Sequence, residues 1–433
     1  MPGPAPSSRL RLVPILLAQG IGFACGVASI GVNSHLLPPA TLGLYGLFLS
    51  VVPIGTWVVH AGLAKFVGRH WAASPRRPQL AREVTAAWAR RLPWLAVLTA
   101  AASWFMPGGS VGETLVMAGA LFAAASLLSL GQMAQAALQA MQAHWRDCAV
   151  TVAGSLTRSF GPPLLYAALG GSLALLWTGF TLHALVLAAA GVWMLRPEWQ
   201  RPGPVPAGPP GLTAVYEGPL FIILAAAGWT TGAVNRWLIA SFYGETEAGY
   251  FTLMGGAAGV VTSMLGTVIM QYAQPGLYAR GDRAAGEGAP LARQADRLAL
   301  GYALAAATAL AGLHGAAPWL VGSLINPAYA PALFWIVPGG AFTIAIFTAV
   351  IYHATLLAGL RESACARVDL TTSFVLVGGC VLGAVLGRGV LAGWMTFAPV
   401  VTWLLTRTLA RQALFRPAPA PAPAPDRSGT SGG

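Results

Sequence analysis

The sequence predicts an all-α, polytopic integral membrane protein with about twelve transmembrane helices in two six-helix lobes around a central cavity. Of its 433 residues, 56% are hydrophobic and only 9% are charged, whereas an ordinary soluble domain is about 25% charged. Its apolar segments are long enough to cross about 30 Å of hydrocarbon at 1.5 Å per residue. Its basic residues also gather in alternate loops, which is typical of a membrane protein with a fixed orientation.

The twelve predicted transmembrane helices follow one another with short connections. They cover approximately residues 12–32, 42–63, 93–107, 114–137, 148–169, 172–195, 218–241, 249–272, 298–320, 332–358, 370–387 and 389–407. The first follows the N-terminal residues MPGPAPSSRLRLVP, which lack the pattern of a cleavable signal peptide, so we expect it to remain as a helix. Strands of a membrane barrel need only about 9 to 11 residues, so the segment lengths exclude a barrel.

The basic residues predict which side of the membrane each loop occupies. If the N-terminus is cytoplasmic, 22 of the 25 Lys and Arg residues lie on the inner side, and only Arg158, Arg236 and Arg388 remain. Both termini are then cytoplasmic, as are the long basic loops at residues 64–92 and 274–297. Topology and contact with anionic lipids account for the net charge of +12, so the charge does not indicate nucleic-acid binding.

The chain divides into two halves that resemble each other. Aligning Gly43 with Gly249 places LLPPATLGLYGLFLSVVP over FYGETEAGYFTLMGGAAG at an offset of 206 residues. Six helices in each half make parallel repeats, which pack around an axis along the membrane normal with a cavity between them. The predicted parts are an N-terminal lobe (1–196), a cytoplasmic Pro/Gly-rich linker (197–216), a C-terminal lobe (217–410) and a disordered Pro-Ala tail (411–433).

Three stretches resemble a known family. HLLPPATLGLYGLFLSVVPIGTWVVHAGLAKFVGRHW, VNRWLIASFYGETEAGYFTLM and INPAYAPALFWIVPGGAFTI are similar to signatures of the bacterial polysaccharide transporters. These are the lipid-linked oligosaccharide, or O-antigen, flippases of the multidrug/oligosaccharidyl-lipid/polysaccharide exporter superfamily. The resemblance implies a V of two lobes around a basic cavity in the bacterial inner membrane. It also implies an undecaprenyl-pyrophosphate-linked sugar as substrate and other polysaccharide assembly proteins as partners.

The predicted membrane interior is basic, which agrees with an anionic substrate. Arg158 and Arg236 lie within predicted spans, whereas the nearest carboxylates, Glu113, Asp147, Glu217 and Asp369, fall at predicted helix ends. A guanidinium can meet a phosphate with paired hydrogen bonds, so we predict that these two arginines bind the pyrophosphate. Further polar groups that we expect along the cavity are Asn235, Ser155, Thr157, His60 and His353.

Arg158 belongs to the stretch GSLTRSFGPPLLY. Its Gly161-Pro162-Pro163 segment is expected to kink or break the helix, because proline lacks the amide hydrogen that a helix uses. Broken helices at membrane depth are tolerated where they line a cavity.

Two other functions compete with the flippase. A multidrug cation exporter of the same superfamily would need a buried carboxylate, and the first helix has none. A membrane polysaccharide polymerase or ligase would need a large outer loop with catalytic side chains, whereas the longest predicted outer loop has about eleven residues. The sequence shows no catalytic nucleophile with a general base, and no nucleotide-binding motif. Its four cysteines lack metal-ligand spacing, so we expect no enzyme activity, cofactor or metal.

Overall fold

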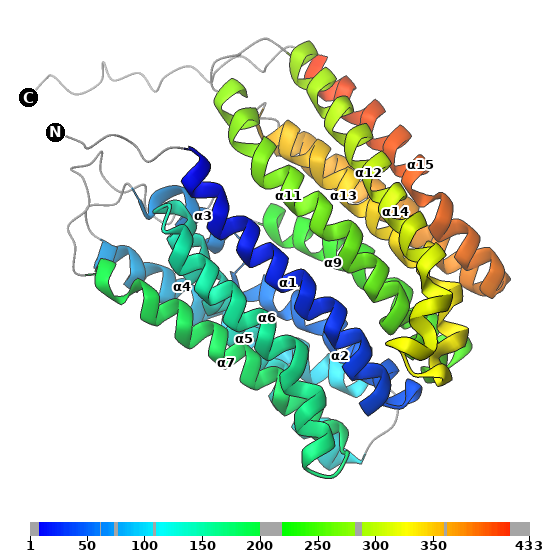
Figure 1. Ribbon diagram of the computed structural model, residues 1–433. Coiled ribbons are helices and arrows are strands. Elements are labelled where there is room, and N and C mark those ends of the chain that lie inside the picture. The colour runs from blue at the N-terminus through cyan, green and yellow to red at the C-terminus, as the bar shows by residue number, and fades with distance from the viewer. Residues whose placement is uncertain are drawn as a thin grey trace, which may run out of the picture.

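The structure is a computed structural model that describes residues 8–60, 62–72, 77–106, 110–199, 219–281, 288–358 and 362–415. The predicted linker, apart from its first three residues, and most of the predicted tail fall outside these ranges. The secondary-structure elements of the described residues are all helices, arranged as a bundle (Figure 1). The predicted all-α fold is therefore confirmed.

The first half of the chain forms an N-terminal group of helices. Its members are α1 (Ser8–Leu36), α2 (Pro39–His60), α3 (Leu63–His70), α4 (Arg77–Trp104), α5 (Val111–Ala140), α6 (His144–Ala168) and α7 (Leu173–Trp199). Here α7 packs against both α5 and α6, α1 packs against α6, and α2 packs against α5. The short α3 buries Leu63, Phe66 and Val67 and packs on α5, because these apolar residues recur at helical spacing.

The second half forms a C-terminal group. It contains α9 (Pro219–Tyr243), α10 (Glu245–Tyr250), the π-helical η1 (Phe251–Gly255), α11 (Gly256–Gly281), α12 (Gly288–Ser323), the 3₁₀-helical η2 (Pro327–Trp335), α13 (Ile336–Ala358), α14 (Glu362–Leu386) and α15 (Arg388–Phe415). Here α13 packs against α11, α12 and α15, and α14 packs against α9 and α15.

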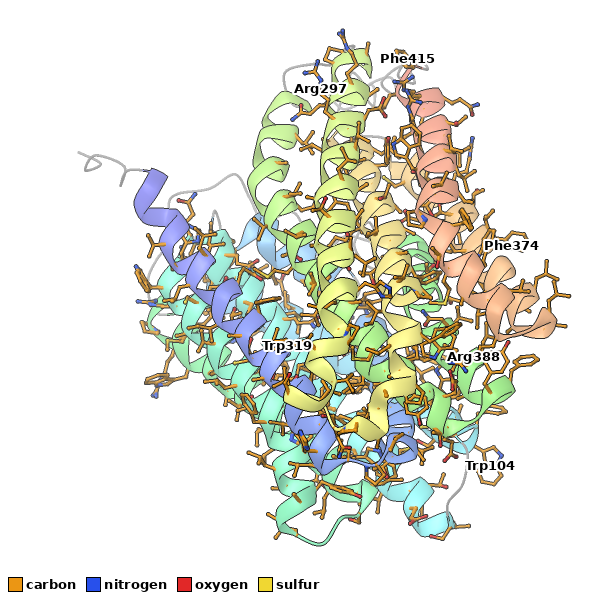
Figure 2. All side chains as sticks on the ribbon, turned by 45° about the vertical axis from the view of Figure 1, so that its right-hand side comes forward. Trp104, Arg297, Trp319, Phe374, Arg388 and Phe415 are labelled. Atoms are coloured by element: carbon orange, nitrogen blue, oxygen red, sulfur yellow. The ribbon has the colours of Figure 1, made fainter. Side chains whose placement is uncertain are left out.

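All twelve predicted membrane helices correspond to helices of the structure. Nine of the described helices, or helix runs, are long and apolar enough to cross a membrane by length and composition. The predicted segments 93–107, 148–169 and 218–241 match α4, α6 and α9, which are not among these nine. Apolar side chains cover the outside of the bundle. Trp104, Trp319 and Phe374, for example, are 77%, 73% and 80% exposed (Figure 2), as expected of side chains that face lipid.

Several helices extend beyond their predicted limits. The predicted loop 64–92 contains α3 and the first four turns of α4. Similarly, α12 begins ten residues before its predicted start at 298, and α14 begins at Glu362 rather than 370. Hydropathy locates only the part of a helix that lies in hydrocarbon, whereas a helix continues into water wherever its backbone hydrogen bonds continue.

The first turn of α1 and the last turn of α15 lie at the same end of the bundle (Figures 1 and 2). Following the arginine asymmetry, we call this the inner end and the opposite end the outer end. Arg297 and Phe415 mark the inner end in Figure 2, where α1 leans away from α11 and α12 toward that end.

At the outer end the two groups meet backbone to backbone, where α2 packs against α10 and η1. A Cβ atom at Gly43 of α2 would overlap the carbonyl oxygen of Glu245. A Cβ atom at Gly249 of α10 would likewise overlap the carbonyl oxygen of Pro39. Only glycine lets two backbones approach this closely. Gly43 and Gly249 are the residues that the repeat aligns, so equivalent segments of the two halves pack against each other.

Two hydrogen bonds also join the groups at the outer end of α1. The Tyr329 hydroxyl in η2 donates to the carbonyl oxygen of Leu37 at 2.8 Å. The backbone N–H of Asn326 donates to the Ser34 hydroxyl at 3.1 Å. Both Ser34 and Tyr329 are buried, so these bonds lie within the packed contact and hold the outer ends of the two groups together.

Candidate functional site

A cavity of about 280 Å³ opens among α2, α5, α6 and α7 of the N-terminal group. Its polar lining comes from Thr56, Gln132, Gln135, Thr151, Ser155, Arg158 and His183, and Trp57 and Phe180 contribute aromatic rings. No aspartate or glutamate is among the described lining residues. Arginine therefore supplies the dominant charge of this N-terminal cavity.

Arg158 projects into the N-terminal cavity from the outer half of α6. It lies ten residues before the helix ends at Ala168, which is about 15 Å at 1.5 Å per residue. The helix continues through Pro162 and Pro163 without interruption, and the expected loss of helical hydrogen bonds follows from the two prolines, which have no amide hydrogen. Gly179 of α7 packs directly against Pro162, because it has no side chain. Pro162 still deprives the Arg158 carbonyl of its usual helical partner, leaving a polar backbone atom beside the guanidinium.

Arg236 approaches from the other group, on α9. The Trp237 indole N–H beside it donates to the Ser50 hydroxyl of α2 at 2.8 Å, which ties this part of α9 to the N-terminal group. The Nε atom of Arg236 is buried and has no hydrogen-bond partner among the described residues. The positive charge of Arg158 acts on Arg236. The fold thus brings together two like charges from opposite halves of the chain.

Among the described ion pairs, none includes either arginine. Two positive charges that interact repel each other; of the two residues, Arg236 is partly buried and Arg158 is exposed. An anion bound near both arginines would offset this repulsion, because a guanidinium group forms paired hydrogen bonds with an oxyanion. Charge therefore favours an anionic ligand near these two arginines.

The further polar residues that were predicted to line the cavity lie in different environments. Asn235 is buried, and its Oδ1 accepts a hydrogen bond from the backbone N–H of Arg236 at 2.9 Å, not from the guanidinium. Ser155 lines the N-terminal cavity beside Arg158. Thr157 does not line it, but its hydroxyl contacts Nδ1 of His183 at 3.1 Å, and His183 does line it. Of these three residues, Ser155 is the one that lines the same cavity as Arg158.

Side-chain pairs order the inner part of the N-terminal cavity. His60 lies just outside its lining, with Nε2 2.5 Å from Oε1 of Gln132. The Gln135 amide donates to the Thr151 hydroxyl at 3.1 Å. Because their partners hold these glutamine side chains in place, the cavity presents oriented polar groups beside the arginine.

A second cavity, of about 270 Å³, lies in the C-terminal group and is bounded by α9, α13 and α14. His353 and Asp369 line it, with 2.7 Å between Nδ1 and Oδ2. Sequence analysis placed Asp369 at a helix end, but α14 begins at Glu362. Asp369 therefore lies about 10 Å inside the helix at 1.5 Å per residue. His353 accordingly belongs to this C-terminal cavity and not to the cavity of Arg158.

Arg388, the third arginine outside the inner loops, has a structural explanation. Its guanidinium forms an ion pair with Glu247 at 2.7 Å and lies over the ring of Phe334 at 4.2 Å. The same Glu247 oxygen accepts a hydrogen bond from the indole of Trp335 at 2.7 Å. Sequence reasoning did not find this partner, because Glu247 and Arg388 are far apart in the chain.

Metal binding has no visible basis in the described part of the chain, where no three His, Cys, Asp or Glu side chains gather as a metal ion would require.

Comparison with solved structures identifies proteins that have a similar fold. No protein family model matches the chain, and no curated protein matches it. A multidrug resistance MATE transporter of the MOP superfamily, in an inward-facing conformation, is 13% identical with a TM-score of 0.63, over 92% of this chain and 98% of its own. The lipid II flippase MurJ, in an inward closed conformation, is 10% identical with a TM-score of 0.63, over 92% and 87%.

A third similar structure is a MOP superfamily transporter from Pyrococcus furiosus Vc1 (DSM3638). It is 16% identical with a TM-score of 0.55, over 94% of this chain and 96% of its own. At these identities the likeness concerns the fold, and the chain therefore has the fold of MOP superfamily transporters. This is the superfamily that the sequence resemblance indicated, while the polysaccharide transporter branch stays a prediction.

Proposed function

We propose that the chain is a flippase that moves an undecaprenyl-pyrophosphate-linked oligosaccharide across the bacterial inner membrane, with both termini in the cytoplasm. The observation that carries the proposal is the pair Arg158 and Arg236. They come from opposite groups, and the charge of one acts on the other. Neither has a carboxylate partner among the described residues. A pyrophosphate is the kind of anion that two planar guanidinium groups bind well.

The proposed mechanism is alternating access. In the present conformation the outer ends of the groups are closed by the contact between Gly43 and Gly249. The substrate enters from the inner leaflet, with its lipid tail in the bilayer and its pyrophosphate between the arginines. A cavity of about 280 Å³ equals roughly nine liquid waters at about 30 Å³ each. It holds a phosphate and its adjoining group, so the remaining sugars lie in the water between the lobes.

Transport fits the fold better than a polysaccharide polymerase or ligase does. MATE transporters and MurJ, which share the fold, are named as transporters or as a flippase. In this chain, the polar groups around Arg158 are amides, hydroxyls and an imidazole. They suit binding and release of an anion, and the proposal assigns no chemical reaction to them.

A multidrug cation exporter is the second candidate function, and the C-terminal cavity favours it. Asp369 and His353 lie within candidate membrane spans and line a largely apolar cavity, where the half-buried Asp369 supplies a carboxylate of the kind that cation binding needs. The MATE transporter named above is a multidrug resistance protein. The P. furiosus transporter, by contrast, is described as having a binding pocket of reverse polarity that suggests a different function, so this fold is associated with more than one pocket polarity.

Gene deletion separates the two candidates. Without the flippase, cells should accumulate the lipid-linked oligosaccharide on the inner leaflet and lose the corresponding surface polysaccharide, while the assembly of the sugar continues. Restoring the wild-type gene should restore the polysaccharide. Unchanged polysaccharide and precursor together with greater sensitivity to cationic drugs would instead establish the multidrug function.

A further inference from the structure

A separate pocket of about 630 Å³ lies at the inner end of the N-terminal group, away from both membrane cavities. The end of α3, the start of α4, and the turn between α5 and α6 form it. Its described lining residues are Ala72, Arg77, Ala140, Met141, Gln142, Ala143, His144, Trp145 and Arg146. Three of these carry basic groups and none carries a carboxylate, so the described lining is positive.

The basic side chains occupy different depths of this inner pocket. Arg77 is 8% exposed and forms the floor, where its guanidinium donates to the carbonyl oxygens of Trp71 and Ala72 at 3.4 and 3.5 Å. Arg146 forms a wall, and its guanidinium donates to the Met194 carbonyl oxygen of α7 at 3.5 Å. These contacts hold both guanidinium groups at the pocket, so they can bind a ligand more specifically than flexible basic side chains on an open surface.

The helix ends raise the positive potential further. Arg77 is the first residue of α4, and Arg146 is the third residue of α6. A helix N-terminus carries about half a positive charge, so a basic side chain there is unfavourable. Asp147 offsets part of this in α6, but it lies outside the described lining, and its Oδ2 accepts a hydrogen bond from Gln139 at 3.1 Å. An anion in the pocket would offset the excess charge of both helices.

The inner pocket also carries an exposed tryptophan. Trp145, on its rim, is 61% exposed, and tryptophan is enriched where a membrane meets water. A basic pocket between membrane helices on the cytoplasmic side is the arrangement that binds anionic lipid headgroups. We propose that this inner pocket binds the phosphodiester headgroup of an anionic phospholipid from the inner leaflet. This site is distinct from the arginine pair proposed for the transported substrate.

The test uses full-length protein purified in a neutral detergent, with phosphatidylglycerol added in mixed micelles. The thermal midpoint should rise with phosphatidylglycerol and not with phosphatidylcholine. Arg146→Gln should raise the half-saturating amount of phosphatidylglycerol about fivefold, the loss expected for one basic residue at an anionic surface. Arg297→Gln is the matched control, because Arg297 is an exposed arginine at the inner end of the other group. It should change the value less than twofold.

A second variant and a soluble probe identify the source of the phosphate. Trp145→Ala keeps every charge but should weaken the phosphatidylglycerol response, because the ring contacts the lipid. Inorganic phosphate should not reproduce the response. Equal losses in Arg146→Gln and Arg297→Gln would overturn the pocket as the site. Saturation by inorganic phosphate, with no effect of Trp145→Ala, would overturn the lipid assignment and leave a free-phosphate site.

Discussion

The outer contact and the arginine pair are two regions between the same helix groups, and they are built in opposite ways. At the outer end, Gly43 and Gly249 bring two backbones together, and a buried hydrogen bond from Tyr329 adds to the contact. Deeper in the membrane, Arg158 and Arg236 bring two like charges within range. The first region consists of close packing, whereas the second would gain from the anion that the proposed function places there.

This difference suggests how a substrate would control the protein. Under the proposed function, close packing at the outer end would hold the conformation that receives substrate from the inner leaflet. Repulsion between the arginines would keep them apart while the site is empty. A bound pyrophosphate would replace the repulsion with attraction and draw the groups together at that depth. A ligand shifts a conformational equilibrium only through such differential interaction.

Replacing Arg158 should have the largest effect on transport. Hydrogen bonds to charged groups contribute about 1.5 to 3 kcal/mol, so Arg158→Gln should lower the initial transport rate in proteoliposomes by about 10- to 100-fold. Arg158→Lys keeps the charge but loses the planar fork, so it should retain part of the activity. Immunoblots control for abundance. A well-inserted Arg158→Gln protein with wild-type transport would contradict the anion site.

Adding one methyl group at Gly43 should have the next largest effect. A Cβ atom there would overlap the backbone of Glu245, and overpacking costs about 1 to 3 kcal/mol. Gly43→Ala should therefore separate the outer ends of the groups. A cysteine at Leu37, where the native side chain is 2% exposed, should then react with a membrane-impermeant thiol reagent added from outside.

Gly119→Ala is the control for this experiment. Gly119 is an exposed helix residue of α5 with no atom within 4 Å of a Cβ position. Alanine should stabilise that helix by about 0.5 to 1 kcal/mol and leave the cysteine at Leu37 protected. If both alanine variants left it protected, the glycine contact would not be what closes the outer end.

The sequence predicts where the helices lie more easily than it predicts which residues of different helices contact each other. Hydropathy finds most of the spans, because burial in lipid requires a continuous apolar stretch, although α4, α6 and α9 are not among the nine described helices that meet this criterion. The repeat aligned Gly43 with Gly249, although nothing in the alignment showed that they touch. The pair His353 and Asp369 was missed because hydropathy ended the helix at the charged residue, whereas α14 continues past it. Helix continuity depends on backbone bonds and side-chain partners that come from distant segments.

The arginines show the same limit. Their cost in hydrocarbon, about 2.5 to 3.5 kcal/mol each on insertion scales, separates them from the inner-loop arginines. It does not separate Arg388, which pairs with Glu247, from Arg158 and Arg236, which lack a described carboxylate partner. Only the folded arrangement makes that distinction. The roles of Arg158 and Arg236 in binding stay predictions.

Replacing Arg236 should have a smaller effect than replacing Arg158. It lies seven residues from the outer end of α9, about 10 Å at 1.5 Å per residue, so its charge is closer to water. Arg236→Gln should lower transport about five- to tenfold, and Arg236→Lys less. The glutamine variant should also raise the thermal midpoint of the empty protein, because it removes the repulsion from Arg158. An unchanged midpoint would argue against that repulsion.

Removing one hydroxyl at the outer contact should have the smallest effect. The Tyr329 hydroxyl donates to the Leu37 carbonyl across the two groups, whereas the equally buried Tyr302 hydroxyl donates to the Thr262 carbonyl within one group. Each bond contributes about 1 kcal/mol, so Tyr329→Phe and Tyr302→Phe should lower the thermal midpoint by similar amounts.

Only Tyr329→Phe should also loosen the contact between the groups. A loss of about 1 kcal/mol changes an equilibrium about fivefold, so labelling of the cysteine at Leu37 from outside should become about five times faster. Tyr302→Phe should leave the labelling rate unchanged, since its bond joins α12 to α11 within the C-terminal group. Equal acceleration by both variants would show that the labelling rate reports a general loss of stability. It would then contradict a separate role of the outer contact in closing the protein.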